Sequence, residues 1–195
     1  MSHSITEMVH EIIRLEGGLV DDKDDPGGIT NKGVSLRYAK GIGLDLDGDG
    51  DTDADDIVLV DHDKAVELFL EDFYRSPQVD RLPPMIQPHM FDFSVNSGAP
   101  RAIMTMQDVL NDIIEEAPEL GYLPLMDDGR MGPKSRRAAE IAQEAMGKEL
   151  NNVICKARLD FMRRIARKNP KLNKYLVRRD GGKGGWVTRV EGFLL

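Results

Sequence analysis

The chain has 195 residues, of which 41% are hydrophobic and 31% charged, a composition typical of a soluble globular protein with one sizeable core or two small lobes. No apolar stretch approaches the roughly 20 residues that span a bilayer, and the net charge of −8 leaves no basic excess for nucleic-acid binding. Cys155 is the only cysteine, which excludes an intramolecular disulfide, and the four histidines lack the spacing of a zinc site.

The N-terminus has neither a basic start nor the apolar block of a secretory signal. We therefore expect synthesis in the cytoplasm without a signal peptide, and no membrane insertion. If the substrate lies outside the membrane, another component must deliver the protein.

Helical periodicity dominates the chain from its first residues. Apolar residues at three- and four-residue steps predict a first helix at about 4–16, which Ser4 and Glu7 begin as a capping box. A turn-rich stretch covers 21–33. Further helices are expected at about 34–40, 63–75, 87–96, 100–111, 133–146 and 150–165. Because no strand-like alternation is found, the predicted fold is mainly α.

Glu16 is the first carboxylate with a chemical interpretation. It follows Ile12 and Ile13 on the apolar stripe, at the C-terminal end of the first predicted helix. Burial and the negative helix end both disfavour the ionised form, so we expect a raised pKa, as a glycosidase general acid needs. The alternative is a glutamate at a frayed helix end that faces water.

The loop after this helix offers a second acidic group. Asp25 follows Glu16 by nine residues, and Thr30 comes five residues later, with Gly27 and Gly28 between them. A glycine-rich turn can bring Asp25 back across a cleft from Glu16, as the pair of carboxylates in glycoside hydrolysis requires. Thr30 could then orient a water molecule. Asp25 can also be only a turn residue before Pro26.

The run EGGLVDDKDDPGGITNKG at 16–33 resembles the signature of glycoside hydrolase family 108, which are muramidases with a lysozyme-like fold. Members occur in phage lysis cassettes, and some relatives are labelled secretion activator proteins. The resemblance implies catalysis by Glu16 and, from the similar order in phage lysozymes, secondary roles for Asp25 and Thr30. Leu19 stands where the family pattern has tyrosine.

The segment 45–56 holds seven aspartates and fits the twelve positions of an EF-hand loop, with glycine at position 6. The predicted calcium ligands are Asp45, Asp47, Asp49, Asp51 through its backbone carbonyl, Asp53 and Asp56. Position 12 is the shorter aspartate Asp56, as in dockerin-type loops, which the segment resembles. The alternative is a solvated acidic loop. We expect one structural Ca²⁺ ion and no cofactor for catalysis.

Three later motifs extend the resemblance over nearly the whole chain. They are FDFSVNSG at 91–98, DGRMGPKS at 128–135, and Gly185-Trp186 followed by Arg189-Val190. They imply a lysozyme-like catalytic half at 1–90, with the insertion 45–56, and a helical peptidoglycan-binding half at 91–195. We expect Trp186 to serve the core of the second half rather than to stack on sugar.

Two functions are consistent with these residues. The first is a phage-like muramidase, or endolysin, that cuts the β-1,4 bond between N-acetylmuramic acid and N-acetylglucosamine, with Glu16 as general acid. The second is a non-catalytic, calcium-dependent wall-binding or secretion-helper protein. In both, the partner is peptidoglycan glycan strands, and a holin or a secretion machinery would deliver the chain to the wall.

Overall fold

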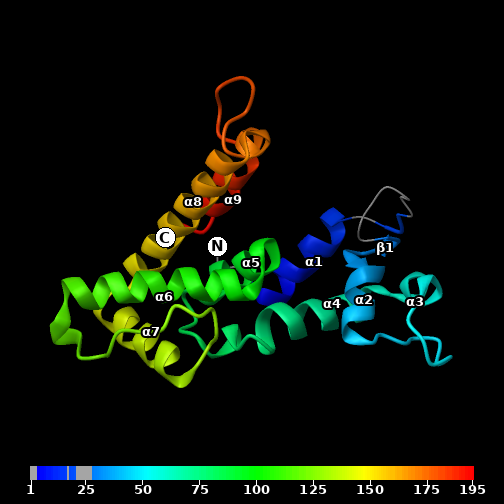
Figure 1. The fold of residues 1–195 in the computed structure, drawn as a ribbon, viewed down its shortest axis with the longest axis horizontal. Helices are drawn as coiled ribbons and strands as arrows, with labels where there is room; N and C mark the ends of the chain where they lie inside the picture. Colours follow the sequence, from blue (N-terminus) through cyan, green and yellow to red (C-terminus); the bar gives the residue numbers. More distant parts are fainter. Residues whose placement is uncertain (1–3, 17, 21–27) are drawn as a thin grey trace. The chain divides into compact units, whose positions relative to one another are not determined.

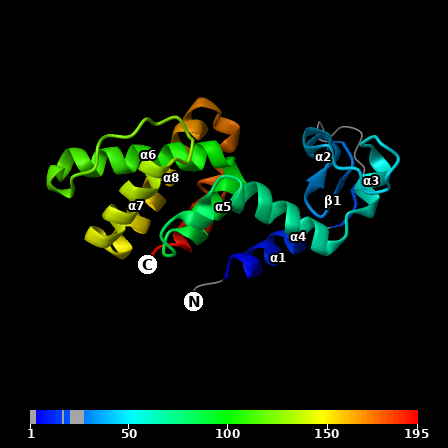
Figure 2. The same cartoon turned by 90° about the horizontal axis from the view of Figure 1, so that it is seen from below.

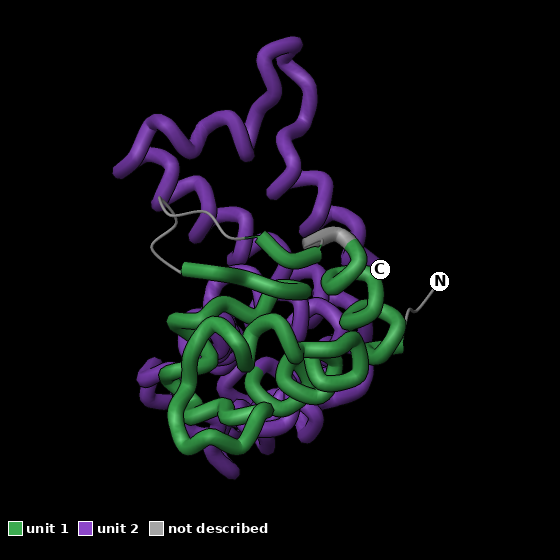
Figure 3. The backbone as a smooth tube through the Cα atoms, turned by 90° about the vertical axis from the view of Figure 1, so that its right-hand side faces the viewer, with its two compact units in different colours: residues 1–72 green, residues 73–195 purple. Residues whose placement is uncertain are grey.

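The computed structural model describes residues 4–16, 18–20 and 28–195, and it divides into two compact units, residues 1–72 and 73–195 (Figure 3). Most of the described chain is helical, and the only sheet in it has two strands of two residues each. The mainly α, lysozyme-like fold with a helical C-terminal lobe is therefore confirmed. No helix in the described part of the chain is long and apolar enough to cross a membrane.

The described residues of the first unit form four helices and a small hairpin. The helices are α1 (Ile5–Glu16), α2 (Leu36–Ile42), α3 (Ala54–Leu59) and α4 (His62–Leu70), and the strands are β1 (Thr30–Asn31) and β2 (Val34–Ser35). Helices α1 and α4 lie side by side in Figures 1 and 2. Their facing sides are apolar: Val9 and Ile13 are buried on α1, and Ala65 and Phe69 on α4. This packing holds the C-terminal end of α1 in the unit.

The second unit is an all-helical lobe around α5 (Gln87–Ser97), whose middle turns are buried on every side. Helix α6 (Ala99–Glu116) packs against α5, α7 (Pro133–Met146) and α8 (Lys148–Lys168), and α9 (Gly185–Glu191) packs against α8. The short turns η2 (Val79–Arg81), η3 (Pro118–Leu120) and η4 (Pro170–Tyr175) complete the unit. The turn η1 (Glu71–Arg75) contains the last two residues of the first unit and the first three of the second.

Local sequence signals explain where most helices begin. Ser4 and Glu7 exchange backbone-to-side-chain hydrogen bonds of 2.8 and 3.2 Å, which confirms the predicted capping box at the start of α1. Prolines occupy the first turns of α5, α6 and α7, where the missing N–H costs nothing. The predicted helices at 4–16, 87–96 and 133–146 are confirmed almost to the residue.

Among the differences from the expected elements, three lie between residues 34 and 75. Residues 34–35 form β2, so α2 begins two residues later than predicted. Helix α3 begins inside the aspartate-rich loop, because Asp53 and Asp56 make a second capping box there. The predicted helix at 63–75 is α-helical only to Leu70 and continues as the π-helical turn η1.

Candidate active site and wall-binding half

Helix α1 presents Glu16 at its last turn. The helix buries Met8, Val9, Ile12 and Ile13, so its orientation within the first unit is fixed by one apolar face. Glu16 is the final residue of this helix, and only its backbone belongs to the described part of the chain. Asp25 lies outside the described residues. The structure thus gives the helix that carries the predicted acid, and it leaves the predicted Glu16–Asp25 pair untested.

The hairpin that follows places Thr30 next to the chain leaving α1. Val20 and Thr30 exchange two backbone hydrogen bonds of 2.8 Å, so the stretch that contains Asp25 starts and ends at one point. The Thr30 hydroxyl donates to the Gly28 carbonyl at 3.2 Å, and its oxygen lone pairs remain able to accept from water. Lys32 and Gly33 form the tight turn, both with positive φ, which glycine adopts at Gly33 without steric cost.

Asn31 is a site residue whose role the sequence did not reveal. Its side chain is 4% exposed, and its amide donates to the backbone carbonyls of Ile57 and Val60, both at 3.0 Å. These carbonyls end helix α3, so Asn31 ties the hairpin to the C-terminal end of that helix. The Thr-Asn pair of the signature therefore combines one half-buried hydroxyl with one buried structural amide.

Leu19 and Val20 form an exposed apolar pair just beyond α1. Leu19 is 52% exposed and Val20 54% exposed, although both are large hydrophobic side chains. The position where the family pattern has tyrosine is therefore on the surface beside the end of the helix that carries Glu16. An exposed side chain there is free to contact a substrate.

Helices α2 and α3 form a helix–loop–helix, and the aspartate-rich segment is its loop together with the start of α3. Oxygen atoms of Asp45, Asp47 and Asp49 lie within 4.8 Å of one another, and those of Asp51, Asp53 and Asp56 form a second group by the same measure. Backbone N–H groups organise the loop, because Gly48 donates to Asp45 at 2.6 Å and Gly50 donates to the other oxygen of Asp45 at 3.1 Å. The carboxylates of these six aspartates thus form two groups of three, and binding of calcium by them stays a prediction.

Charge within this loop is only partly compensated. The pKa of the Asp51 carboxyl is raised, mainly by the neighbouring charge of Asp49. Loss of solvent contact and the charge of Asp53 are smaller causes of the same shift. Asp56 differs, because its side chain accepts from the N–H groups of Asp53 at 2.8 Å and Leu46 at 2.5 Å, which lower its pKa. The loop therefore combines one well-satisfied carboxylate with exposed, mutually repelling ones.

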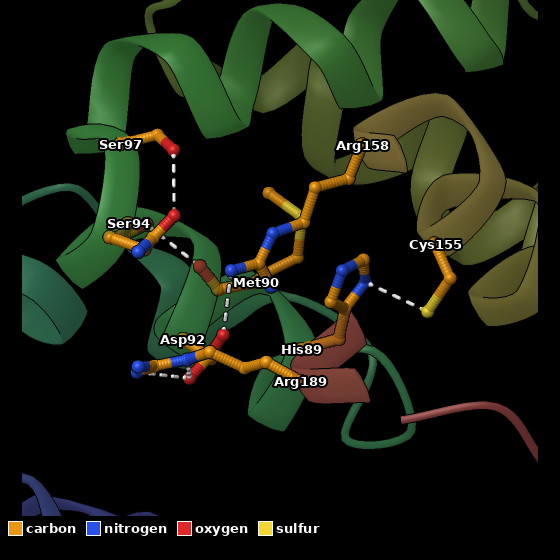
Figure 4. Close-up of polar contacts among 9 residues, drawn as sticks. His89, Met90, Asp92, Ser94, Ser97, Cys155, Arg158 and Arg189 are labelled. Atoms are coloured by element: carbon orange, nitrogen blue, oxygen red, sulfur yellow. Dashed lines mark hydrogen bonds and ion pairs between the residues drawn. The ribbon is translucent and has the colours of Figure 1, made fainter. Parts of the chain in front are cut away.

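In the second unit, the first and last family-like motifs meet in an ion cluster, of which Asp92 and Arg158 are buried and Arg189 is exposed (Figure 4). Asp92 of α5 accepts from Arg189 of α9 at 2.7 and 2.8 Å, and its other oxygen lies 2.8 Å from Arg158 of α8. Arg158 is fully buried, and its contact with Asp92 is a close ion pair without good hydrogen-bond alignment. Its guanidinium also lies over the Phe93 ring, 4.8 Å from the centroid. One aspartate thus links three helices.

Beside this cluster, His89 and Cys155 form a buried neutral pair. The Cys155 sulfur lies 3.5 Å from Nδ1 of His89 (Figure 4), and both residues are at most 1% exposed. Burial, and then the charge of Arg158, hold the pKa of His89 well below its usual value. Burial raises the pKa of the Cys155 thiol to about 12. The thiol is therefore an inert core group and not a nucleophile.

The middle motif is also structural. Gln107 of α6, 1% exposed, donates to the Arg130 carbonyl at 3.0 Å and to Ser135 at 3.1 Å, and it accepts from the Gly129 N–H at 2.9 Å. Gly129 has a φ of +71°, and a Cβ there would lie 2.5 Å from the Pro100 carbonyl oxygen, so only glycine fits. Trp186 packs against the core cluster around Cys155 and Met162, as predicted.

Comparison with known proteins finds two different domains, one in each half of the chain. Residues 9–98 match the glycosyl hydrolase 108 family, and residues 101–191 match the predicted peptidoglycan domain. The solved structure of SagA from Brucella abortus is similar in fold, with a TM-score of 0.62 and 23% identity over 94% of this chain and 87% of that one. No match is found among curated proteins. The chain therefore carries a glycosyl hydrolase 108 domain followed by a predicted peptidoglycan domain, a combination that supports a peptidoglycan-acting glycosidase.

Proposed function

We propose that the chain is a muramidase that hydrolyses the β-1,4 bond between N-acetylmuramic acid and N-acetylglucosamine, with Glu16 as the general acid. The observation that carries this proposal is the position of Glu16 at the end of α1, inside the glycosyl hydrolase 108 match. Glu16 would protonate the leaving glycosidic oxygen, and Asp25 would stabilise or hydrate the sugar cation. Thr30 would hold a water molecule through its free lone pairs.

The hairpin supports this division of roles. Hydrogen bonds between Val20 and Thr30 close the loop that begins four residues after Glu16. Asn31 anchors the same hairpin to α3. The helix end and the anchored hairpin fix the backbone positions of Glu16 and Thr30, as catalysis by positioned groups requires. The non-catalytic wall-binding or secretion-helper alternative would need no such arrangement.

Clearing of purified cell walls tests the catalytic role. Glu16→Gln removes the acid while keeping the size of the side chain, and loss of a general acid slows turnover by roughly 10²–10⁴-fold. Glu11→Gln is a matched control, because Glu11 is an exposed glutamate on the same helix. We expect clearing to be lost in the first variant and kept in the second. Equal clearing by both would remove Glu16 from the mechanism.

We further propose that the segment 45–56 binds one structural Ca²⁺ ion. The donor set fits, because calcium takes six to eight oxygens and the loop gathers six aspartates between two helices. Residues Asp45, Asp47, Asp49, Asp53 and Asp56 would supply carboxylates, and Asp51 its backbone carbonyl. The ion would neutralise the repulsion that raises the pKa of Asp51.

A further inference from the structure

The two units carry opposite net charge. Residues 1–72 contain 19 acidic and six basic side chains, a net of −13, whereas residues 73–195 contain 15 acidic and 20 basic side chains, a net of +5. The positive charge is itself concentrated: residues 163–183 hold nine basic side chains and one acidic one. We name this stretch, from the last turns of α8 to the loop before α9, the basic end.

All nine cations of the basic end are exposed. Three of them have ion-pair partners, Arg163 with Asp160, Arg178 with Asp180, and Lys183 with Glu191. Within the described part of the chain, the other six have no carboxylate within ion-pair distance: Arg164, Arg167, Lys168, Lys171, Lys174 and Arg179. So many unpaired like charges repel one another, and an anionic partner would relieve that repulsion.

The basic end is an ordered structure. Its loop, drawn beyond the end of α8 in Figure 1, is closed by hydrogen bonds of 2.8 Å from the Arg178 N–H to the Gly182 carbonyl and from the Gly184 N–H to the Leu176 carbonyl. A Cβ on Gly184 would lie 2.3 Å from the Tyr175 carbonyl oxygen, so the closure requires glycine. Tyr175 stacks on Trp186 with centroids 5.1 Å apart, which joins η4 to α9. The cations are therefore displayed on a fixed frame.

The polar residues Asp92, Gln107 and Arg158, which connect the motifs of this half, are almost fully buried and serve the packing of the lobe. The basic end, in contrast, holds six exposed cations without a carboxylate within ion-pair distance. Peptidoglycan stem peptides carry free carboxylates along the glycan, so the charges are complementary.

We propose that the basic end holds peptidoglycan through the carboxylates of its stem peptides, an inference that rests on the proposed function. The acidic first unit would be repelled by the same polymer, so the basic end would also orient the chain on the wall. Complementary charge of this kind speeds association and sets orientation, and its effect falls as salt screens it over a Debye length of about 10 Å at 0.1 M.

The test is co-sedimentation with purified sacculi stripped of protein, lipid and attached polymers, in the Glu16→Gln background so that the walls stay intact. The double variant Lys171→Glu/Arg179→Glu reverses two exposed, unpaired cations of the basic end. The control Lys134→Glu/Lys148→Glu makes the same charge change at exposed lysines in the first turns of α7 and α8. We expect the first variant to bind about tenfold more weakly at low salt, and the control to change binding by less than about twofold.

A second arm identifies the anion. Capping the sacculus carboxylates with glycinamide should weaken binding of the unaltered basic end as much as the double variant does. Equal binding of capped and uncapped walls would overturn the proposal. So would a double variant that loses affinity only for phosphatidylglycerol vesicles, since this would assign the surface to a membrane. In either case, wall clearing by the chain with Glu16 intact would leave the muramidase proposal standing.

Discussion

Asp92 links three helices of the second unit through two arginines. It compensates Arg158, which is fully buried, and it also binds Arg189 from the last helix. A buried ion pair adds little net stability over an apolar core, but removing one partner strands the other charge away from water. Asp92 therefore favours the arrangement of α5, α8 and α9 in which the buried charge of Arg158 has a counterion.

We predict that Asp92→Asn lowers the free energy of unfolding by about 3–5 kcal/mol, because Arg158 keeps its charge without a counterion. Asp160→Asn is the control: its pair with Arg163 is exposed and should contribute at most about 1 kcal/mol. Urea unfolding followed by circular dichroism measures both. Similar losses in the two variants would contradict the assigned role of the buried cluster.

His89 makes the stability of the chain depend on pH. Its pKa is held well below the usual value by burial and then by Arg158, so the folded chain keeps the ring neutral. Below about pH 6.5 the unfolded chain binds a proton that the folded chain does not, and the free energy of unfolding should fall by up to about 1.4 kcal/mol per pH unit. Above that pH this contribution is constant.

His89→Gln should remove this part of the pH dependence, since the amide does not titrate. The measurement compares the slope of the unfolding free energy between pH 7.5 and 5 in the two proteins, which differ only at residue 89. An unchanged slope in the variant would show that His89 takes up its proton in the folded state.

At the scale of elements, the aspartate-rich helix–loop–helix shows what sequence can and cannot predict. The twelve-position spacing predicted a single ring of ligands, and the structure brings the same residues together as two groups of three. The sequence did not predict that α3 begins at Ala54, because Asp53 and Asp56 serve both the ligand pattern and the capping box. Aspartate fits both the calcium-ligand pattern and the capping box, so the spacing alone could not show where α3 begins.

Calcium should raise the melting temperature of the chain, and a chelator should lower it. A ligand that binds only the folded state adds roughly 2.7 kcal/mol at a hundredfold excess over its dissociation constant. Magnesium should do less, since it resists dehydration. Asp49→Ala should abolish the response, while Asp55→Ala, an exposed aspartate outside the ligand set, should keep it. If calorimetry at millimolar calcium detects no binding, the segment is only a solvated loop.

Strong periodicity made the long helices predictable, and weak local signals hid the short elements. Helices α1, α5 and α7 carry apolar stripes or prolines that mark their limits. Strands of two residues, such as β1 and β2, are too short to show alternation. Helix α9 follows a glycine-rich run that indicates a loop, and its position depends on contacts with α8. Tertiary contacts therefore decide the elements that the sequence missed.

At the scale of the whole molecule, the sequence predicted two halves, 1–90 and 91–195. The structure divides into units 1–72 and 73–195, and the family matches cover 9–98 and 101–191. Helix α5 explains why these limits do not coincide: it lies inside the glycosyl hydrolase match, yet Asp92 and His89 bind it to α8 and α9. Long-range pairs such as Asp92–Arg189 cannot be read from local sequence.

The activity that we propose for this chain is cleavage of the peptidoglycan glycan at N-acetylmuramic acid. Mass spectrometry of the soluble products from purified sacculi tests it most directly, with the reducing ends labelled by borohydride reduction. We predict new reducing ends on N-acetylmuramic acid with the unaltered chain and with Glu11→Gln, and none with Glu16→Gln. Reduced N-acetylglucosamine ends, or peptide bonds cut in place of glycosidic ones, would contradict the muramidase assignment.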